Sequence, residues 1–147
     1  MKGYIILIML MFKVCLYGQH PNALLREGNK LYNRERYNDA EVLYRKSMDK
    51  NKDNYISRFN LGASVYKQNN YKEAEKQFEL VSNGKYSDNV KSKAYYNLGN
   101  SLLKQERYSE AIEAYKKSLK INSKDNDAKY NLSYALKKLM MKQQQNQ

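Results

Sequence analysis

The chain has 147 residues, of which 41% are hydrophobic and 29% charged, with one proline and no tryptophan. This composition favours one small helical domain and argues against a large enzyme with a deep core. With 27 Lys and Arg against 15 Asp and Glu, the net charge of +12 indicates either a solvated helical surface or an affinity for anionic partners.

The first eighteen residues have the pattern of a secretory signal peptide. Lys2 precedes an apolar run over residues 4–12, and Gly18 is the small residue after which cleavage is expected. We therefore assign residues 1–18 to a signal peptide and expect export to the periplasm or to the periplasmic face of the inner membrane. Two alternatives stay open, an uncleaved membrane anchor and a lipoprotein with its lipid on Cys15.

Beyond residue 20 the same residue types recur in three copies. Four sets of residues correspond: Gly28, Gly62 and Gly99, then Tyr37, Tyr71 and Tyr108, then Ala40, Ala74 and Ala111, then Tyr44, Phe78 and Tyr115. The spacing is 34 residues from the first to the second copy and 37 from the second to the third, which is typical of stacked helical repeats. The predicted segments are three repeats at 21–54, 55–88 and 92–125, a C-terminal capping helix at 126–141 and a Gln-rich tail at 142–147.

Each copy is predicted to form two helices. In the third copy Leu98 and Leu102 are spaced for one helix, a polar stretch follows, and Ala111 and Tyr115 are spaced for another. Ser109 is a candidate N-cap of the second helix, because its hydroxyl can accept a hydrogen bond from an unpaired backbone amide. One such pair cannot bury its apolar side alone, so the pairs are expected to stack.

The 34-residue period, the Leu-Gly pairs at 61–62 and 98–99, and the tyrosine, alanine and aromatic that follow make the chain resemble the tetratricopeptide repeat (TPR) family. The resemblance covers about residues 21 to 139. It implies an all-α fold, a right-handed superhelical solenoid of helix-turn-helix repeats closed by a capping helix.

A narrower resemblance covers nearly the whole chain. A signal peptide, three repeats, the ending DAKYNLSYALKKL and the Gln-rich tail resemble the TPR component of the Bat aerotolerance operons of Bacteroidetes-type bacteria. This resemblance implies von Willebrand factor A type membrane proteins of the cell envelope as partners.

Few residues offer chemistry. His20 is the only histidine and the glycines are scattered, so the sequence contains neither a His/Cys metal cluster nor a glycine-rich phosphate loop. Carboxylate pairs such as Glu73 and Glu75 lie on segments that are expected to be exposed, without the apolar surroundings of a catalytic acid or base. We therefore expect no enzymatic activity, no cofactor and no metal.

The resemblance to TPR proteins implies a concave groove, lined by the first helix of each repeat, that binds an extended peptide. The matching residues are Asn29, Tyr32, Phe59, Asn60, Tyr66, Lys93, Tyr96, Asn97, Asn100, Tyr130 and Asn131, with Leu25, Arg26, Asn33, Ala63, Lys67, Leu103, Lys104, Tyr134, Lys137 and Lys138 beside them. Asn60, Asn97 and Asn131 occupy one equivalent position. Their amides either form a row that binds a peptide backbone or serve neighbouring helices, and the sequence favours neither.

One subset of the family binds a C-terminal carboxylate with two lysines, two asparagines and an arginine. The matching positions here hold Leu25, Asn29, Asn60, Lys93 and Asn97. Because two of the three cations are missing, and with them much of the charge-assisted bonding, a strict carboxylate clamp is not expected. Tyrosines beside lysines favour an acidic or mixed peptide instead.

The leading functional interpretation is a non-enzymatic scaffold of the bacterial cell envelope, which binds partner proteins in the groove, in a Bat-type aerotolerance complex. One alternative is a basic surface that binds nucleic acid or other polyanions, and another is a regulatory subunit of an enzyme complex. An exported protein meets little nucleic acid, so no nucleic-acid partner is expected. Association with the envelope membrane is compatible with all of these.

Overall fold

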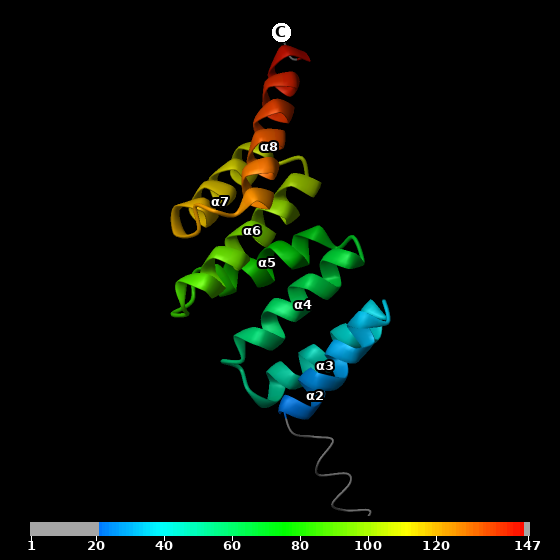
Figure 1. Cartoon of the computed structure of the whole chain (residues 1–147). Helices are drawn as coiled ribbons and strands as arrows, with labels where there is room; N and C mark the ends of the chain where they lie inside the picture. Colours follow the sequence, from blue (N-terminus) through cyan, green and yellow to red (C-terminus); the bar gives the residue numbers. More distant parts are fainter. Residues whose placement is uncertain (1–20, 146–147) are drawn as a thin grey trace, which may run out of the picture. The chain divides into compact units, whose positions relative to one another are not determined.

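The computed structural model describes residues 21–145, and the regular structure of that range is entirely α-helical. The helices follow one another in Figure 1 as α2 (Pro21–Asn33), α3 (Tyr37–Lys50), α4 (Tyr55–Lys67), α5 (Tyr71–Ser82), α6 (Asp88–Lys104), α7 (Tyr108–Ile121) and α8 (Asn126–Gln145). Within this range no helix has the length and apolar character needed to cross a membrane. The predicted signal peptide, residues 1–18, lies outside the described residues.

The described chain divides into two compact units, and the boundary falls inside α4, between Leu61 and Gly62. In the first unit α2 packs against α3. In the second unit α6 packs against both α5 and α7, and α7 packs against α8. The predicted all-α class and the helix-turn-helix pairing are therefore confirmed, and in the second unit the packing of α6 on α5 joins one pair to the next.

An aromatic ring lies directly on a glycine in each helix pair. A Cβ atom placed on the glycine would lie 2.7 Å from the Tyr44 ring at Gly28, 2.9 Å from the Phe78 ring at Gly62 and 2.6 Å from the Tyr115 ring at Gly99. These distances are too short for any real Cβ, so only glycine lets the ring approach. This packing explains why glycine recurs inside a helix, where it costs about 1 kcal/mol relative to alanine.

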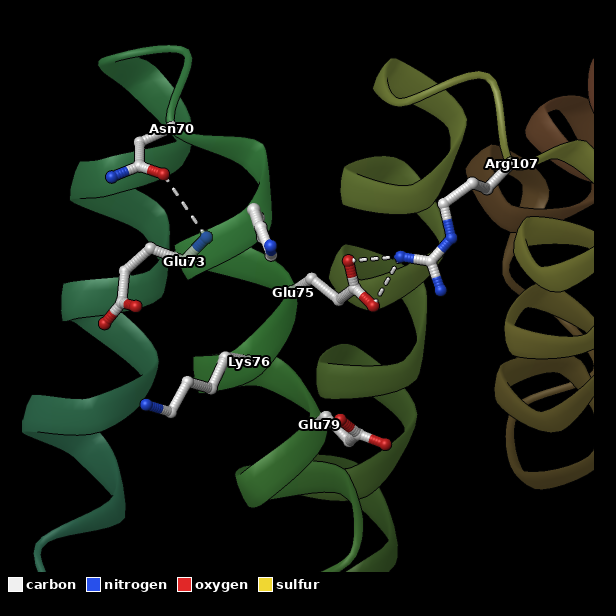
Figure 2. Close-up of a pocket in the computed structure, with 7 residues that line it drawn as sticks. Asn70, Glu73, Glu75, Lys76, Glu79 and Arg107 are labelled. Atoms are coloured by element: carbon white, nitrogen blue, oxygen red, sulfur yellow. Dashed lines mark hydrogen bonds and ion pairs between the residues drawn. The ribbon is translucent and has the colours of Figure 1, made fainter.

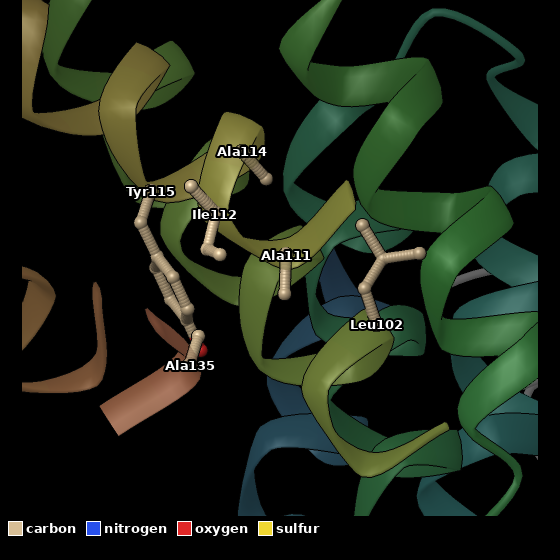
Figure 3. Close-up of a cluster of buried hydrophobic side chains, with 6 residues drawn as sticks. All are labelled: Leu102, Ala111, Ile112, Ala114, Tyr115 and Ala135. Atoms are coloured by element: carbon tan, nitrogen blue, oxygen red, sulfur yellow. The ribbon is translucent and has the colours of Figure 1, made fainter. Parts of the chain in front are cut away.

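The core of the second unit is built around Tyr115 (Figure 3). Its fully buried ring packs in a cluster with Leu102, Ala111, Ile112 and Ala135, which come from α6, α7 and α8. The alanines allow the helix backbones to come close, and the ring fills the space between them. Three helices therefore depend on one aromatic side chain.

The turn inside each helix pair contains a residue in the left-handed backbone region. Glu35, Asn69 and Glu106 have φ angles of 60°, 62° and 58°, at equivalent places in the three turns. This region costs about 1–2 kcal/mol for most residues and less for asparagine, whose short side chain tolerates it. Two of the three turns therefore contain an unfavourable residue.

Replacing Glu106 by glycine is expected to raise the free energy of unfolding by about 0.5–1 kcal/mol, because glycine adopts positive φ without strain. Chemical denaturation of the full chain measures the change. Asn69→Gly is the matched control and is expected to have a smaller effect. An unchanged or lower stability of Glu106→Gly would show that the turn is not strained.

Two helix ends differ from the sequence prediction. Ser109 is not the N-cap of α7: the helix begins at Tyr108 and Arg107 takes the cap position, where its side chain bonds Glu110 in the first turn. At the C-terminus α8 continues to Gln145, past the predicted end at residue 141. Lysine and glutamine are good helix formers, so the Gln-rich segment extends the helix.

Candidate functional site

The second unit contains a hollow of about 450 Å³, to which α4, α6 and α8 contribute side chains. Its lining consists of Tyr66, Tyr96, Asn100, Leu103, Lys104, Tyr130, Asn131 and Tyr134. We call it the tyrosine hollow. Its volume lies within the range of about 300–1,000 Å³ that is usual for ligand pockets.

The tyrosine hollow offers aromatic surface and positive charge. Tyr130 and Tyr134 are 72% and 42% exposed, so their rings are accessible to a ligand, and Lys138 Nζ lies 5.5 Å from the centroid of the Tyr134 ring. Tyr66 is held edge-on against Tyr71 with ring centroids 5.2 Å apart, and burial raises the pKa of its hydroxyl. Lys104 is the one charged residue in the lining, so the hollow favours an anionic or neutral ligand.

The two asparagines of the tyrosine hollow are bonded to each other. Asn131 Nδ2 donates to Asn100 Oδ1 at 2.9 Å, and the Tyr115 hydroxyl donates to the same oxygen at 2.7 Å. Asn131 also lies 3.3 Å from the Tyr96 hydroxyl. We call this set of three side chains an amide bridge: Tyr115 and Asn131 are the donors and Asn100 is the acceptor. It joins α7, α6 and α8.

The first unit contains an equivalent amide bridge. Asn60 Nδ2 and the Tyr44 hydroxyl both donate to Asn29 Oδ1, at 2.8 Å and 2.9 Å. Asn60 and Asn131 therefore serve a neighbouring helix, which was one of the two alternatives left open by the sequence. In the middle repeat Ala63 and Phe78 replace the accepting asparagine and the tyrosine, so Asn97 has no such bridge.

Titration of Tyr44 is expected to destabilise the first unit at high pH. Burial raises the pKa of Tyr44 to about 12, above the value of about 10 for an exposed tyrosine. The folded state therefore holds the proton more tightly than the unfolded state, and the resulting stability is full below pH 10 and lost as the pH rises towards 12. Denaturation midpoints of the wild type and Tyr44→Phe across this range test the effect, because the variant should lose less stability. Parallel curves would contradict it.

Only some of the residues that were predicted to line the groove lie together in the tyrosine hollow. Tyr66, Tyr96, Asn100, Tyr130 and Asn131 line the tyrosine hollow together with Leu103, Lys104 and Tyr134. Of the other predicted residues, Asn29 and Asn60 form the bridge of the first unit, Tyr32 packs edge-on against Tyr37, Phe59 and Asn97 are half-buried, and Lys93 is exposed. None of these lines the tyrosine hollow.

A second hollow, of about 460 Å³, lies beside α5 and is lined by Asn70, Lys72, Glu73, Glu75, Lys76, Glu79 and Arg107. Figure 2 shows the Glu75 carboxylate pointing towards the Arg107 guanidinium, whose Nη1 donates to both carboxylate oxygens at 2.7 Å. Gln105 donates to the same carboxylate at 2.8 Å, and Arg107 also pairs with Glu110 and lowers the pKa of that carboxyl. The charges around Arg107 are thus paired within the protein, so we interpret this hollow as a brace between successive repeats.

Removing this brace is expected to cost stability. Arg107→Ala should lower the free energy of unfolding by about 0.5–1.5 kcal/mol, because Glu75 is partly shielded from water and loses the guanidinium that bonds both of its carboxylate oxygens. Arg107→Lys should recover only part of this, since an ammonium group cannot bridge two carboxylates in the same way. The matched control is Arg36→Ala, which removes only an exposed pair with Asp39. Equal losses in urea denaturation for the two alanine variants would contradict the brace.

Metal chemistry has no structural support in the residues that the structure describes. Across positions 21–145 no group of three or more His, Cys, Asp or Glu side chains is placed to hold a metal ion. The polar side chains of the tyrosine hollow are amides, phenols and one lysine. Such groups bind a ligand by stacking and hydrogen bonding.

Comparison with known proteins gives consistent matches to one family. Models of the tetratricopeptide repeat match residues 92–125 and 25–89. Curated proteins give no match. Among solved structures, the Sgt2 TPR domain from Aspergillus fumigatus is 25% identical with a TM-score of 0.73, and the match covers 84% of this chain and 82% of that one.

Two similar solved structures contain bound partners. The TPR2AB domain of yeast Sti1 in complex with pHSP90 is 26% identical with a TM-score of 0.72, over 84% of this chain and 48% of that one. The first TPR of Spaghetti (RPAP3), bound to the HSP90 peptide SRMEEVD, is 21% identical with a TM-score of 0.73, over 84% of this chain and 95% of that one. The second similarity concerns the fold alone.

Proposed function

Since this chain belongs to the tetratricopeptide repeat family, we propose that it is a non-enzymatic scaffold that binds an extended segment of a partner protein in the tyrosine hollow. The observation that carries the proposal is the hollow itself, in which four tyrosines, two amides and one lysine converge from three helices. The yeast Sti1 domain, solved with pHSP90, supports the use of this fold for holding protein segments.

The lining defines the chemistry of the segment. Exposed rings such as those of Tyr130 and Tyr134 bury apolar and aromatic side chains at little cost in conformational entropy. Lys104 adds a cation, and the amides of Asn100 and Asn131 are already bonded to each other. The partner segment is therefore acidic or mixed and is held by side-chain stacking more than by a row of amides.

The cellular setting is a second part of the proposal. The signal-peptide pattern of residues 1–18 and the resemblance to the Bat group support a place in the cell envelope, at the periplasmic face of the inner membrane. They also support von Willebrand factor A type membrane proteins as partners in an aerotolerance complex. An alkaline phosphatase fusion to the full chain tests export, and co-purification with such membrane proteins tests the partner. A cytoplasmic fusion product would reject the envelope setting while leaving the hollow untouched.

The hollow itself is tested by a variant that removes its most exposed rings. Tyr130→Ala with Tyr134→Ala should leave the fold intact and deplete specific proteins from a quantitative pull-down by the full chain. The matched control is Leu80→Ala with Ile121→Ala, which removes exposed apolar side chains that do not line the hollow. Retention of every partner by the tyrosine variant, with helical content and thermal midpoint unchanged, would reject this binding site.

A further inference from the structure

Helix α8 holds the position of a first helix in an incomplete fourth repeat. Ala128 and Ala135 are fully buried, as are Ala94 and Ser101 at the equivalent positions of α6. α8 packs against α7, as α6 packs against α5. One side of α6 faces α7, the helix that follows it. The corresponding side of α8 has no covering helix within the described residues.

We call this side of α8 the outer face; it consists of Lys129, Ser133, Leu136 and Met140, which are all exposed. Leu136 is 43% exposed and Met140 60%. Leu102, the equivalent of Leu136 in α6, is only 5% exposed because it is packed in the cluster with α7 residues. Contiguous exposed apolar side chains of this kind mark interaction surfaces.

The shape of the outer face excludes a covering helix like α7. In the third repeat Tyr115 occupies the space over Gly99, where a Cβ atom would lie 2.6 Å from the ring. Ser133 occupies the glycine position and has a Cβ atom, and its hydroxyl donates to the Lys129 carbonyl at 3.0 Å. A helix that covers this face therefore needs a small residue opposite Ser133.

The charge of the outer face is a second restriction. In the third repeat Lys117 of α7 lies over the Tyr95 ring, 5.6 Å from its centroid. Lys129 replaces that tyrosine in α8 and Lys137 replaces Leu103, so a lysine on the covering helix would meet like charge. An acidic side chain would be attracted instead, and a second copy of this chain, with its net charge of +12, is disfavoured.

We propose that the outer face of α8 binds an amphipathic helix of a partner protein, with an acidic side chain opposite Lys129 and a small one opposite Ser133. Leu136 and Met140 supply the apolar contact, in the manner of a helix laid on a hydrophobic surface. This site is separate from the tyrosine hollow, so the chain can hold two segments at once.

Two synthetic peptides test the proposal against the full chain. One has the sequence of α7, and the other is the same peptide with Tyr115→Ala and Lys117→Glu. Fluorescence anisotropy should show the altered peptide binding about tenfold more tightly, because it removes one clash and converts a repulsion into an attraction. Lys129→Glu in the full chain should reduce this preference, because it inverts the charge effect and leaves the clash at Ser133. Equal binding of the two peptides, or no binding of either, would overturn the proposal.

Variants of the full chain locate the site. Leu136→Ser with Met140→Ser should abolish binding of the altered peptide, whereas Met141→Ser, about 100° further round the helix, should leave it unchanged. Tyr130→Ala with Tyr134→Ala should also leave it unchanged, which separates this site from the proposed function. An equal effect of Met141→Ser would contradict the placement of the site on the outer face. Self-association, or binding to anionic vesicles, that is lost with Leu136→Ser and Met140→Ser would assign the outer face to another occupant.

Discussion

Tyr115→Ala is expected to lower the free energy of unfolding by about 3–5 kcal/mol, the usual cost of removing a buried aromatic ring. The ring is fully buried, lies on Gly99 and shares a cluster with residues of α6, α7 and α8. Domains have a total stability of about 5–15 kcal/mol, so this single change should remove a large share of the stability. Urea denaturation followed by circular dichroism measures the loss.

Tyr115→Phe separates the packing of the ring from its hydrogen bond. Phenylalanine keeps the ring over Gly99 but removes the donor to Asn100, so the expected loss is about 0.5–1.5 kcal/mol. The matched control is Tyr108→Phe, because the Tyr108 side chain is only half-buried. If Tyr115→Phe were as damaging as Tyr115→Ala, the hydroxyl and not the ring would dominate.

Phe78→Tyr in the middle repeat is expected to cost about 1–3 kcal/mol, because it buries a hydroxyl without the asparagine acceptor that serves Tyr44 and Tyr115. Phe78 is 1% exposed and lies on Gly62, as Tyr115 lies on Gly99. Ala63→Asn supplies the missing acceptor at the position of Asn100, and Asn97 supplies the second donor. The double variant should therefore recover most of the lost stability by building a third amide bridge.

A double-mutant cycle on the full chain measures this coupling. The two single variants and the double variant are compared by urea denaturation, and the expected coupling between positions 63 and 78 is about 1–2 kcal/mol in favour of the double variant. The same cycle with Asn97→Ala in the background should give less coupling, because the bridge then has only two members. Additive effects in both backgrounds would show that the bridge does not transfer between repeats.

The helix pairs could be predicted from the sequence because local packing fixes them. Glycine, alanine and an aromatic recur at fixed spacing, and each aromatic lies on the glycine of its own pair. The helix ends were less predictable, since Arg107 takes the N-cap position of α7 without a side-chain cap bond and pairs instead with Glu110 in the first turn. Arg36 and Asp39 make the same arrangement at α3, and arginine is not among the residues that usually cap a helix.

The candidate site was predicted in part. The tyrosines could be predicted because they occupy equivalent positions in the repeats. The hydrogen-bond partners of the asparagines could not be predicted, because an amide side chain suits a peptide backbone and a neighbouring helix equally well. The sequence nevertheless contained a signal for the amide bridge. Asparagine follows the repeat glycine where the second helix has tyrosine, as in Asn29 with Tyr44. Alanine follows the glycine in the repeat whose second helix has Phe78. The uncovered outer face of α8 had no such signal, because exposure depends on tertiary packing.

Site-specific photo-crosslinking tests the central claim, that the tyrosine hollow holds a partner segment, most directly. The photoreactive residue p-benzoylphenylalanine is placed at Tyr134 inside the hollow and, as a control, at Leu80 on α5, two positions that are 42% and 48% exposed. In cells that produce the full chain, irradiation should join a defined partner protein to position 134 and not to position 80, and Lys104→Glu should weaken the product. Capture of the same partner from position 80 with none from position 134 would contradict the account.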